Sequence, residues 1–483
     1  LRSTLMTGWI HDLNLLDQCV LMFSIPLIVL YFIFGLDDFF VDFLAWALEC
    51  RPSGLDREEL REILSADEKK IAILVASWKE SGVLRKMVRG NSRTIRYRNY
   101  DFILGVYPND PDTLEEAQEL AKQHPNVRVV VNSLAGPTSK GQMLNEMIRA
   151  AEGYDGYLIH DSEDIIHRYA LPLVNWQLNT ADFIQIPIFS LPVEKTEFVA
   201  GTYIDEFSEY HTKDILLRHK LGVPIPSAGV GTALSSRLVA VYLDAQDGNL
   251  LNEKSLTEDY ELGVSTSRYD LVSAFACHYF QNEKNEVEYI ATREYFPKSF
   301  SRSIRQKTRW TVGIAFQGYK NLGWHGGLFE RYFLYRDRKG PYTHLLVASG
   351  WVFFFYCAYR GLSQPAFAQA LSDSPLLYFG FAFNAFFMLN RILQRMYCVS
   401  QVYGFSMALV GIVRLPIVNL INAVAGFQAI QQYARSRVFG FTLTWVKTDH
   451  EMPVGFGVEL ETEVSGLVVA SEASAASEES KTA

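Results

Sequence analysis

The feature that most constrains this chain is an uncharged apolar run near its start, over residues 19–36. The run reads CVLMFSIPLIVLYFIFGL and is followed at once by Asp37 and Asp38. A helix needs roughly 20 apolar residues to cross the hydrocarbon core of a bilayer, so the run predicts a transmembrane helix. A cleaved signal peptide is the alternative, but the run is long for one and no small-residue cleavage site follows it. We therefore predict an N-terminal transmembrane helix within residues 1–45.

Two further apolar regions lie in the last third of the chain. One begins near Leu345 with LLVASGWVFFFYCAY, and the other covers residues 376–389. Basic side chains precede the first region and follow the second: Arg331, Arg336, Arg338, Lys339, Arg391 and Arg395. Because basic residues favour the cytoplasmic ends of membrane helices, the two regions predict a multi-pass protein whose soluble part faces the cytoplasm.

The last apolar stretch, over residues 397–428, is interrupted by Arg414 and Pro416. A charge at bilayer depth is costly, so we predict helices that lie in the membrane interface or pack on the bundle rather than a further span. Membrane and interfacial helices together are expected over residues 321–440. The tail over 457–483 is rich in Ala, Ser and Glu, a composition typical of disorder.

Composition excludes two classes of function. The chain is acidic, with a net charge of -9, and sequence-independent binding to nucleic acid rests on many basic contacts to phosphates. The 5 cysteines form no CxxC pair, so the sequence predicts neither a zinc site nor a disulfide framework.

The region between the first two membrane helices alternates short apolar runs with helical patterns. The runs predicted as buried strands cover residues 71–76, 102–107, 127–131, 156–160 and 183–188. Residues 112–124 and 139–151, which lie between runs, have the pattern of helices. Such alternation predicts a doubly wound, largely parallel sheet, whose ligands bind at the carboxyl ends of its strands. We place this domain at residues 60–320.

Polar residues gather where the predicted strands end, in four segments: 77–81, 108–112, 136–141 and 161–164. Any one of them is equally typical of a solvated loop or a helix cap. Four at one edge of a sheet indicate a binding site. Asp161 and Glu163 place two carboxylates where Mg²⁺ could be shared with substrate phosphates, and Lys140 begins a helix, where phosphate binds readily.

An acidic cluster follows in the segment SLTEDYELG, which contains Thr257, Glu258 and Asp259. A carboxylate here could act as a general base toward a hydroxyl group. The alternative is a helix N-terminus in which Thr257 is the cap and the acidic residues favour the helix dipole. By itself the cluster favours the cap.

A basic helix is predicted around residues 302–310, with Gln306, Arg309 and Trp310 near one face. The arginine could bind a diphosphate, and the tryptophan could stack on a sugar ring. An amphipathic helix at a membrane surface is the alternative, and the two interpretations are compatible.

Taken in order, these motifs resemble the processive family 2 glycosyltransferases, the type that includes cellulose, chitin and hyaluronan synthases. The matching elements are Trp78-Lys79-Glu80, Asp110, the helix start from Lys140 to Asn145, Asp161-x-Glu163, Gly229-x-Gly231, Thr257-Glu258-Asp259 and Gln306-x-x-Arg309-Trp310. Within the family, the chain is similar to the inner-membrane type associated with phage adsorption. That likeness covers residues 34–450 and includes YPNDPDT, GPTSK, HDSED, TYIDEFSE, PSAGVGT, SLTEDY, REYFP and RQKTRW.

The resemblance implies a GT-A type doubly wound mixed sheet with transmembrane and interfacial helices at both ends. It implies a role for each matched residue. The donor nucleotide would be held by Glu80, Asp110, Lys140, Asp161 and Glu163, the last two through Mg²⁺ or Mn²⁺. Asp259, with Glu258 beside it, would be catalytic. The acceptor and the diphosphate would contact Gly229, Gly231, Gln306, Arg309 and Trp310, and residues 441–456 resemble a gating loop.

The function implied is transfer of a sugar, N-acetylhexosamine as the first choice, from a UDP-sugar to a growing polysaccharide with inversion. The expected setting is the bacterial inner membrane, with an outer-membrane or periplasmic export partner and no nucleic acid. Two alternatives stay open. One is a non-processive transferase that acts on a lipid-linked acceptor, and the other is a catalytically silent phage receptor or scaffold.

Three departures limit what the resemblance implies. Lys79 stands where these enzymes often have Asn, and Glu163 replaces the usual second Asp of the metal motif while keeping a carboxylate. Full-length relatives carry a further C-terminal domain associated with cyclic-di-GMP control, and this sequence stops in a short tail. We therefore expect no control by that route.

Overall fold

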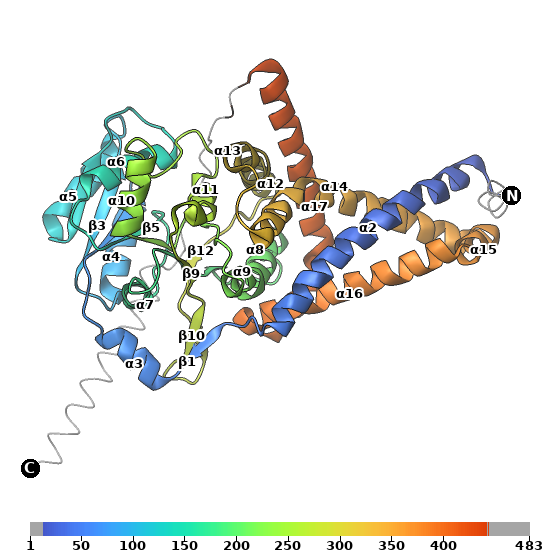
Figure 1. Cartoon of the computed structure of the whole chain (residues 1–483), viewed down its shortest axis with the longest axis horizontal. Coiled ribbons are helices and arrows are strands. Elements are labelled where there is room, and N and C mark those ends of the chain that lie inside the picture. The colour runs from blue at the N-terminus through green and yellow to red at the C-terminus, as the bar shows by residue number, and fades with distance from the viewer. Residues whose placement is uncertain (1–12, 442, 444–483) are drawn as a thin grey trace, which may run out of the picture.

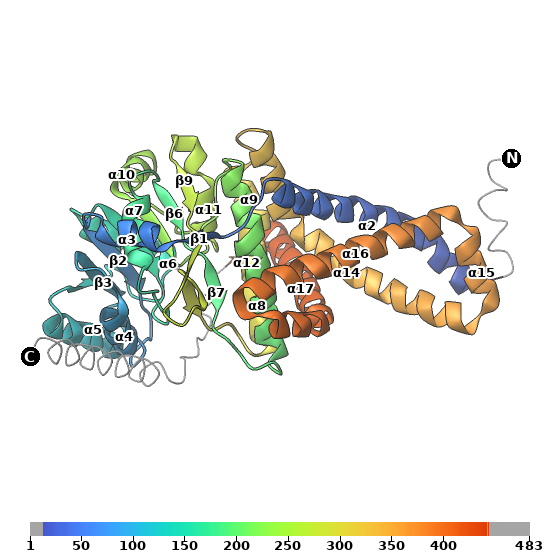
Figure 2. The ribbon, with the colours of Figure 1, turned by 90° about the horizontal axis from the view of Figure 1, so that it is seen from below.

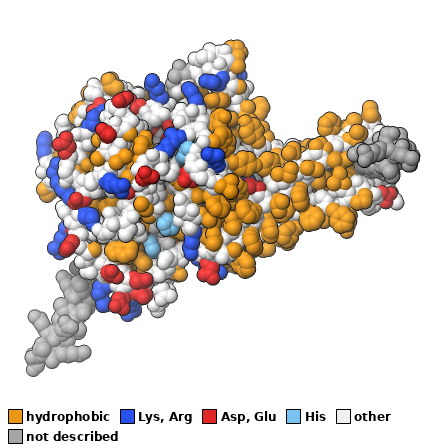
Figure 3. Space-filling view, in the orientation of Figure 1, with side chains coloured by type: hydrophobic (Ala, Val, Ile, Leu, Met, Phe, Trp, Pro, Cys, Tyr) orange, Lys and Arg blue, Asp and Glu red, His pale blue; other side chains and the backbone are white. Residues whose placement is uncertain are grey.

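The computed structural model describes residues 13–441 and 443, so the predicted gating loop and tail lie almost wholly outside the described residues. The two ends of the molecule differ in architecture. An α/β domain forms one end, and long helices project from it to form the other (Figure 1 and Figure 2). On the face seen in Figure 3, hydrophobic side chains cover the projecting helices, whereas charged side chains are spread over the α/β end. The apolar segments of the sequence therefore gather at one end of the molecule, and the segments of ordinary composition form the other end.

A seven-stranded sheet forms the centre of the α/β domain, in the order β4-β3-β2-β5-β8-β6-β9. Its strands are β2 (Ile71–Ala76), β3 (Tyr100–Val106), β4 (Val127–Val131), β5 (Gly156–His160), β6 (Phe183–Gln185), β8 (Thr232–Ser235) and β9 (Ser273–Phe275). Strands β2 to β5 run parallel, and β8 runs antiparallel to both β5 and β6. All of β5 and nearly all of β2 are buried because helices cover both faces. The predicted mixed, doubly wound sheet of GT-A type is confirmed.

The predicted strand over 183–188 is wrong in its extent. Strand β6 ends at Gln185, and β7 (Ile188–Ser190) pairs instead with β12 (Thr292–Glu294) in a separate sheet. Pro187, between them, has no backbone N–H to donate to the main sheet. A third small sheet contains β1 (Ser53–Leu55), β10 (His278–Gln281) and β11 (Val287–Tyr289).

Helices pack on both faces of the central sheet. Met143 of α6 belongs to the apolar core on one face, and Met87 of α4 and Leu120 of α5 belong to the core on the other. The helices of the α/β domain are α3 (Arg57–Ser65), α4 (Leu84–Thr94), α5 (Pro111–Gln123), α6 (Lys140–Ala150), α7 (Ala170–Gln177), α8 (Phe198–Glu209), α9 (Ile215–Lys220), α10 (Ser236–Ala245), α11 (Glu258–Val264), α12 (Phe300–Thr311) and α13 (Gly318–Leu322), with short π and 3-10 turns η1 (Tyr210–Asp214), η2 (Thr266–Tyr269) and η3 (Val312–Gln317).

Four helices of the described chain are long and apolar enough to cross a membrane: α2 (Leu15–Ala47), α14 (Leu328–Ser363), α16 (Pro375–Tyr403) and α17 (Phe405–Phe439). Helices α2, α14 and α16 form a bundle, and the short α15 (Pro365–Asp373) lies at its far end (Figure 1). The apolar runs seen in the sequence are only parts of these helices. Helix α2, for example, continues past Asp37 and Asp38 to Ala47.

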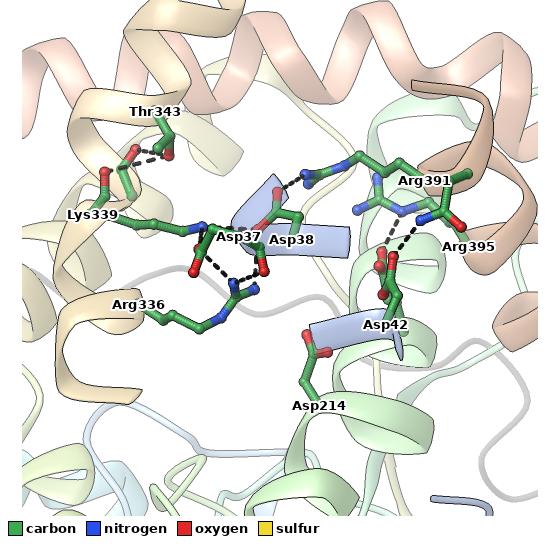
Figure 4. Close-up of polar contacts among 12 residues, drawn as sticks. Asp37, Asp38, Asp42, Asp214, Arg336, Lys339, Thr343, Arg391 and Arg395 are labelled. Atoms are coloured by element: carbon green, nitrogen blue, oxygen red, sulfur yellow. Dashed lines mark hydrogen bonds and ion pairs between the residues drawn. The ribbon is translucent and has the colours of Figure 1, made fainter. Parts of the chain in front are cut away.

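Asp37 and Asp38 belong to a network of ion pairs where the bundle meets the α/β domain (Figure 4). Arg336 and Lys339 of α14 pair with both aspartates, and Arg391 of α16 pairs with Asp38. The basic residues noted before the second apolar region thus lie on the same helix as that region. Arg336 and Lys339 neutralise the two carboxylates of α2, and Arg391 adds a contact from α16, so the network connects all three helices.

Helix α17 runs across the base of the bundle rather than along it (Figure 1). Arg414, the charge that interrupts its apolar sequence, is fully buried and donates to both carboxylate oxygens of Asp205 on α8, at 2.8 and 2.6 Å. Pro416 lies inside the helix without ending it. This position fits the prediction of a helix packed on the bundle, because the charge faces protein rather than lipid.

Candidate active site

A cavity lies at the carboxyl edge of the central sheet, beyond the ends of β2 and β5. Its lining includes 10 of the residues predicted from the sequence: Glu80, Lys140, Asp161, Glu163, Gly229, Glu258, Asp259, Gln306, Arg309 and Trp310. They come from loops and helices that are far apart in the sequence. The parallel strands end at this edge and bring four of them together in the segments that follow β2, β4 and β5, whereas α11 and α12 add five more from outside the sheet.

Lys140 lies in the first turn of α6 and reaches the loop after β5. Ser139 caps the helix by accepting a hydrogen bond of 3.2 Å from the backbone N–H of Gln142. The Lys140 ammonium group pairs with the carboxylate of Asp161 and donates to the carbonyl oxygen of Gly229 at 3.1 Å. Burial opposes this charge, but the carboxylate of Asp161 raises the pKa of Lys140. The lysine therefore remains a cation at a helix N-terminus, where phosphate oxygens bind readily.

Gly229 allows the cavity wall to approach the candidate base. Its φ of +83° is in the left-handed region, which favours glycine. A Cβ at this position would lie 2.6 Å from Oδ2 of Asp259, closer than real Cβ contacts come. The backbone conformation therefore favours glycine here, and a larger residue would also push against the carboxylate of Asp259.

Asp259 and Glu258 form the first turn of α11 and line the cavity. Burial raises the pKa of Asp259, against the opposing effects of Lys140 and Arg309. Burial and the negative charge of Asp259 raise the pKa of Glu258 to about 7. A carboxylate with a raised pKa accepts a proton more readily, which suits a general base.

The alternative interpretation, in which the side chain of Thr257 caps a helix, is wrong about the capping hydrogen bond. Thr257 is at the N-cap position of α11, but its side chain makes no capping hydrogen bond. The hydroxyl oxygen is buried without a partner in the described structure, and the side chain packs against Gly313. The two acidic residues thus lie at a helix N-terminus, as the alternative stated, and also at the cavity.

Gln306, Arg309 and Trp310 line the cavity from one side of α12, as their spacing predicted. The Nε atom of Arg309 is buried and has no hydrogen-bond partner among residues 13–441 and 443. Its donor is therefore available to an anionic group such as a diphosphate. Lys307 points elsewhere, since it pairs with Glu206 of α8 and donates to Asn422 of α17.

Tyr203 of α8 is a residue that the sequence reasoning missed. Its hydroxyl donates to Oε1 of Gln306 at 2.8 Å and lies 3.0 Å from Oγ of Ser303. Its ring stacks on Phe296 and meets the ring of Trp310 edge-on, with 6.3 Å between the centroids. Tyr203 therefore fixes two of the three predicted residues of α12. The segment TYIDEFSE matched the family, but no pattern linked it to α12.

Asp110 does not line the cavity. Its Oδ2 accepts a hydrogen bond of 2.6 Å from the backbone N–H of Lys79, and thus holds the loop that carries Trp78 and Glu80. Lys79 has a φ of +55°, a left-handed conformation that asparagine adopts more readily than lysine. The predicted contact of Asp110 with the nucleotide remains a prediction, and its observed contact is with the loop.

Gly231 also lies outside the cavity lining. Its N–H donates to the carbonyl oxygen of Ile159, and its own carbonyl oxygen accepts from Ile186. A Cβ here would lie 2.7 Å from Oγ1 of Thr292, and φ is +60°. The observed role of this glycine is close packing where β8 begins, beside the cavity rather than in it.

Carboxylates concentrate around the loop after β5. Asp161 and Glu163 line the cavity together with Glu294 of β12, a residue that the sequence reasoning did not select. Burial and the charges of Asp164, Glu163 and Asp161 raise the pKa of Glu294. The described residues contain no group of three His, Cys, Asp or Glu side chains that could hold a metal ion. Two oxygen donors beside an anion-binding lysine fit an Mg²⁺ or Mn²⁺ ion whose other ligands are substrate phosphates and water.

The sequence model of the family described as "Glycosyltransferase like family 2" matches residues 68–313. The chain belongs to this family. The match begins just before β2 and ends just after α12, so it includes every predicted site residue of this family 2 glycosyltransferase.

Two relatives match most of this family 2 glycosyltransferase. They are bacteriophage adsorption protein B of Escherichia coli strain K12 and bacteriophage N4 adsorption protein B of E. coli O157:H7, each 36% identical over 480 residues. The predicted resemblance to the phage-adsorption type is confirmed. Each match covers 92% of this chain and 63% of the relative, so the chain spans less than two thirds of the relatives' length. The expected lack of cyclic-di-GMP control stays a prediction.

Solved structures with a similar arrangement include a mannosyltransferase from Pyrobaculum calidifontis in complex with GDP-Man and Mn²⁺. It has a TM-score of 0.46 and 12% identity, and covers 84% of this chain and 99% of its own. A glucosyl-3-phosphoglycerate synthase from Mycobacterium tuberculosis, in complex with Mn²⁺, UDP and glucosyl-3-phosphoglycerate, has a TM-score of 0.29 and 16% identity. That match covers 47% of this chain and 77% of the synthase.

Proposed function

We propose that this chain is a membrane glycosyltransferase that transfers a sugar from a UDP-sugar to a growing polysaccharide, with inversion at the anomeric carbon. The meeting of Lys140, Asp161, Asp259, Arg309 and Trp310 around one cavity supports this most directly. These side chains supply cations for a diphosphate, a base for a hydroxyl group and an aromatic face for a sugar. The choice of UDP and of N-acetylhexosamine rests on the resemblance of the motifs alone.

The reaction would be a single displacement. The carboxylate of Asp259 takes the proton of the acceptor hydroxyl as its oxygen attacks the anomeric carbon, and the bond between that carbon and the diphosphate oxygen breaks. Arg309 and Lys140 stabilise the charge that develops on the leaving UDP. An Mg²⁺ or Mn²⁺ ion held by Asp161 and Glu163 would supply further positive charge there. Attack opposite the leaving group inverts the configuration.

The position of α12 supports a polymer as acceptor. Trp310 offers an aromatic surface at the cavity, and α12 packs against α17 at the base of the bundle. A hydrogen bond of 2.9 Å from Lys307 to Asn422 ties the two helices together. An acceptor end held by Gln306 and Trp310 would therefore lie beside the membrane helices. A polymer leaving in that direction would need an export partner in the periplasm or outer membrane.

Two ionic clusters support the placement of the bundle in a bilayer. At the far end, Arg360 of α14 pairs with Asp17 of α2, and the network with Lys339 and Asp38 lies at the near end. Asp17 and Asp38 are 21 positions apart on α2, as are Lys339 and Arg360 on α14. At 1.5 Å per residue this separates the clusters by about 31 Å, close to the roughly 30 Å thickness of a hydrocarbon core.

Helix α17 would then lie in the plane of the membrane interface. Its face away from the protein is apolar and exposed: Leu409, Ile412, Val413, Leu420 and Phe427. These positions recur at helical spacing, opposite the face that buries Arg414. The basic residues at the near end of the bundle support a cytoplasmic α/β domain beneath an inner membrane, because such residues favour the cytoplasmic ends of membrane helices.

Product length tests the processive part of the proposal. Purified enzyme in nanodiscs would be given radiolabelled UDP-N-acetylglucosamine or UDP-glucose, and products sized by gel and mass spectrometry. We expect long products from the wild type, and short or no polymer from Trp310→Ala with UDP binding retained. Addition of a single sugar to each acceptor by the wild type would contradict processivity and favour the transferase to a lipid-linked acceptor.

Two engineered cysteines test the topology, each introduced into a variant in which the exposed native Cys19 is replaced by Ser. Asp112 is exposed on α5, and Gln364 is exposed at the far end of α14. With an impermeant thiol reagent on cells whose outer membrane is permeable to it, we expect labelling of Gln364→Cys but not of Asp112→Cys. The opposite pattern would refute a cytoplasmic catalytic domain.

A further inference from the structure

A second cavity lies between α10, α11 and α13, and Glu258 is the residue of its lining that belongs to a motif matching the family. Its volume is about 440 Å³, within the roughly 300–1,000 Å³ typical of small-ligand sites. Glu258 of α11 lines both this cavity and the candidate active site. The second cavity is therefore a neighbour of the reaction centre rather than an extension of the donor site.

Side-chain amides and the ring of Tyr269 line this cavity. Gln246, Asn249, Asn252 and Asn321 contribute side-chain amides, which both donate and accept hydrogen bonds. The ring of Tyr269, half-buried, lies against that of Tyr242, with 4.8 Å between the centroids. A flat ring beside several amides presents both an apolar face and directional polar groups.

Glu261 is held rigidly in the wall of the cavity. Its Oε1 accepts from Asn321 at 2.7 Å and from Ser255 at 2.6 Å, and its Oε2 accepts from Asn252 at 3.0 Å. A carboxylate fixed in this way is prepared to accept a hydrogen bond from a ligand hydroxyl, since little further ordering is needed.

The charges and polar groups of the lining favour an uncharged polar ligand. Glu253 and Glu261 face Lys254 and Arg268, so two carboxylates balance two cations. Glu258, whose pKa is raised to about 7, adds only a partial negative charge near neutral pH. A phosphate or another anion would therefore gain no net attraction. The side-chain amides offer directional hydrogen bonds that a ligand with many hydroxyl groups can use and an apolar ligand cannot.

We propose that this second cavity is a saccharide-binding site that takes an uncharged sugar unit or a short oligosaccharide, with Tyr269 stacked on a ring face. The inference rests on the proposed function only for the source of the saccharide, which would be the polymer that the enzyme extends. Because Glu258 and Glu261 belong to the helix that carries Asp259, a bound saccharide would contact that helix on a side next to the donor cavity.

Binding without turnover tests the proposal. Full-length protein in nanodiscs, without donor, would be titrated with N-acetylglucosamine tetrasaccharide and with cellotetraose, followed by ligand-observed NMR. We expect at least one probe to bind the wild type and Trp310→Ala alike. Tyr269→Ala should weaken binding by about tenfold, equivalent to about 1.4 kcal/mol, through loss of the stacked ring. Asn321→Ala, which removes an exposed amide, should also weaken saccharide binding.

Two results would overturn the proposal. One is that neither probe binds at 10 mM. The other is that Trp310→Ala abolishes binding while Tyr269→Ala does not, which would place the saccharide in the candidate active site. UDP binding by each variant shows that it is folded. UDP release from the donor, measured on the same samples, distinguishes the two proposals. Turnover without saccharide binding overturns this second site alone. Saccharide binding without turnover overturns the transfer reaction alone.

Discussion

Gly229→Ala is the substitution whose effect follows most directly from the structure. The added Cβ would lie 2.6 Å from Oδ2 of Asp259, about 0.8 Å inside the 3.4 Å at which ordinary contacts begin. Either the base or the loop must move by that amount. A shift of about 1 Å in a reacting group can lower turnover by about 10²-fold, so we expect a loss of that order in kcat.

A matched control separates this contact from backbone strain. Gly153 has a φ of +81°, close to the +83° of Gly229, but a Cβ there would meet nothing within 4 Å. Both substitutions add a side chain to a left-handed residue, which costs roughly 1–2 kcal/mol of stability. Only Gly229→Ala also displaces Asp259. UDP release from donor gives kcat, and thermal unfolding gives stability. Similar loss of stability in both variants, with normal kcat in Gly229→Ala, would refute the placement of Asp259 as the base.

Three further predictions concern the same cavity. Tyr203→Phe removes one hydrogen bond to Gln306, worth about 0.5–1.5 kcal/mol, so the KM for acceptor should rise roughly 2- to 12-fold while UDP binding is unchanged. EDTA should abolish activity and Mg²⁺ or Mn²⁺ restore it, whereas neither ion should rescue Asp161→Ala; full activity in EDTA would exclude the metal. Burial raises the pKa of Asp259, so kcat should fall as pH drops through a range above that of ordinary carboxyl groups, and an acid limb within the ordinary range would contradict Asp259 as the base.

The central fold could be predicted because its strands are buried on both faces. Runs such as IAILVA in β2 and GYLIH in β5 have no solvent-facing side, so continuous apolar sequence is itself the signal. The donor side of the site could be predicted from topology, since residues after parallel strands meet at one edge, whereas the residues on α11 and α12 were predicted from the resemblance of their motifs. The break between β6 and β7 could not be predicted because Pro187 lies within a continuous apolar run in the sequence.

Contacts between distant helices could not be predicted from local pattern. Tyr203 supports Gln306 across 103 positions, and Asp37 pairs with Arg336 across 299. In the sequence, Asp37 marked the end of an apolar run, and only the packing of α2 on α14 shows that the helix continues through it. Asp110 was placed at the right edge of the sheet, but whether it faces the cavity or the Lys79 loop depends on side-chain direction.

The measurement that tests the central claim most directly is UDP release by purified protein in nanodiscs, over a panel of UDP-sugars, for the wild type and Asp259→Asn. A general base contributes about 10²–10⁴-fold. We therefore predict release from at least one UDP-sugar by the wild type, a loss of that size in Asp259→Asn, and nearly unchanged UDP binding in the variant. Equal release by both proteins would contradict Asp259 as the base, and no release from any UDP-sugar by a wild type that binds UDP would contradict the proposed glycosyl transfer.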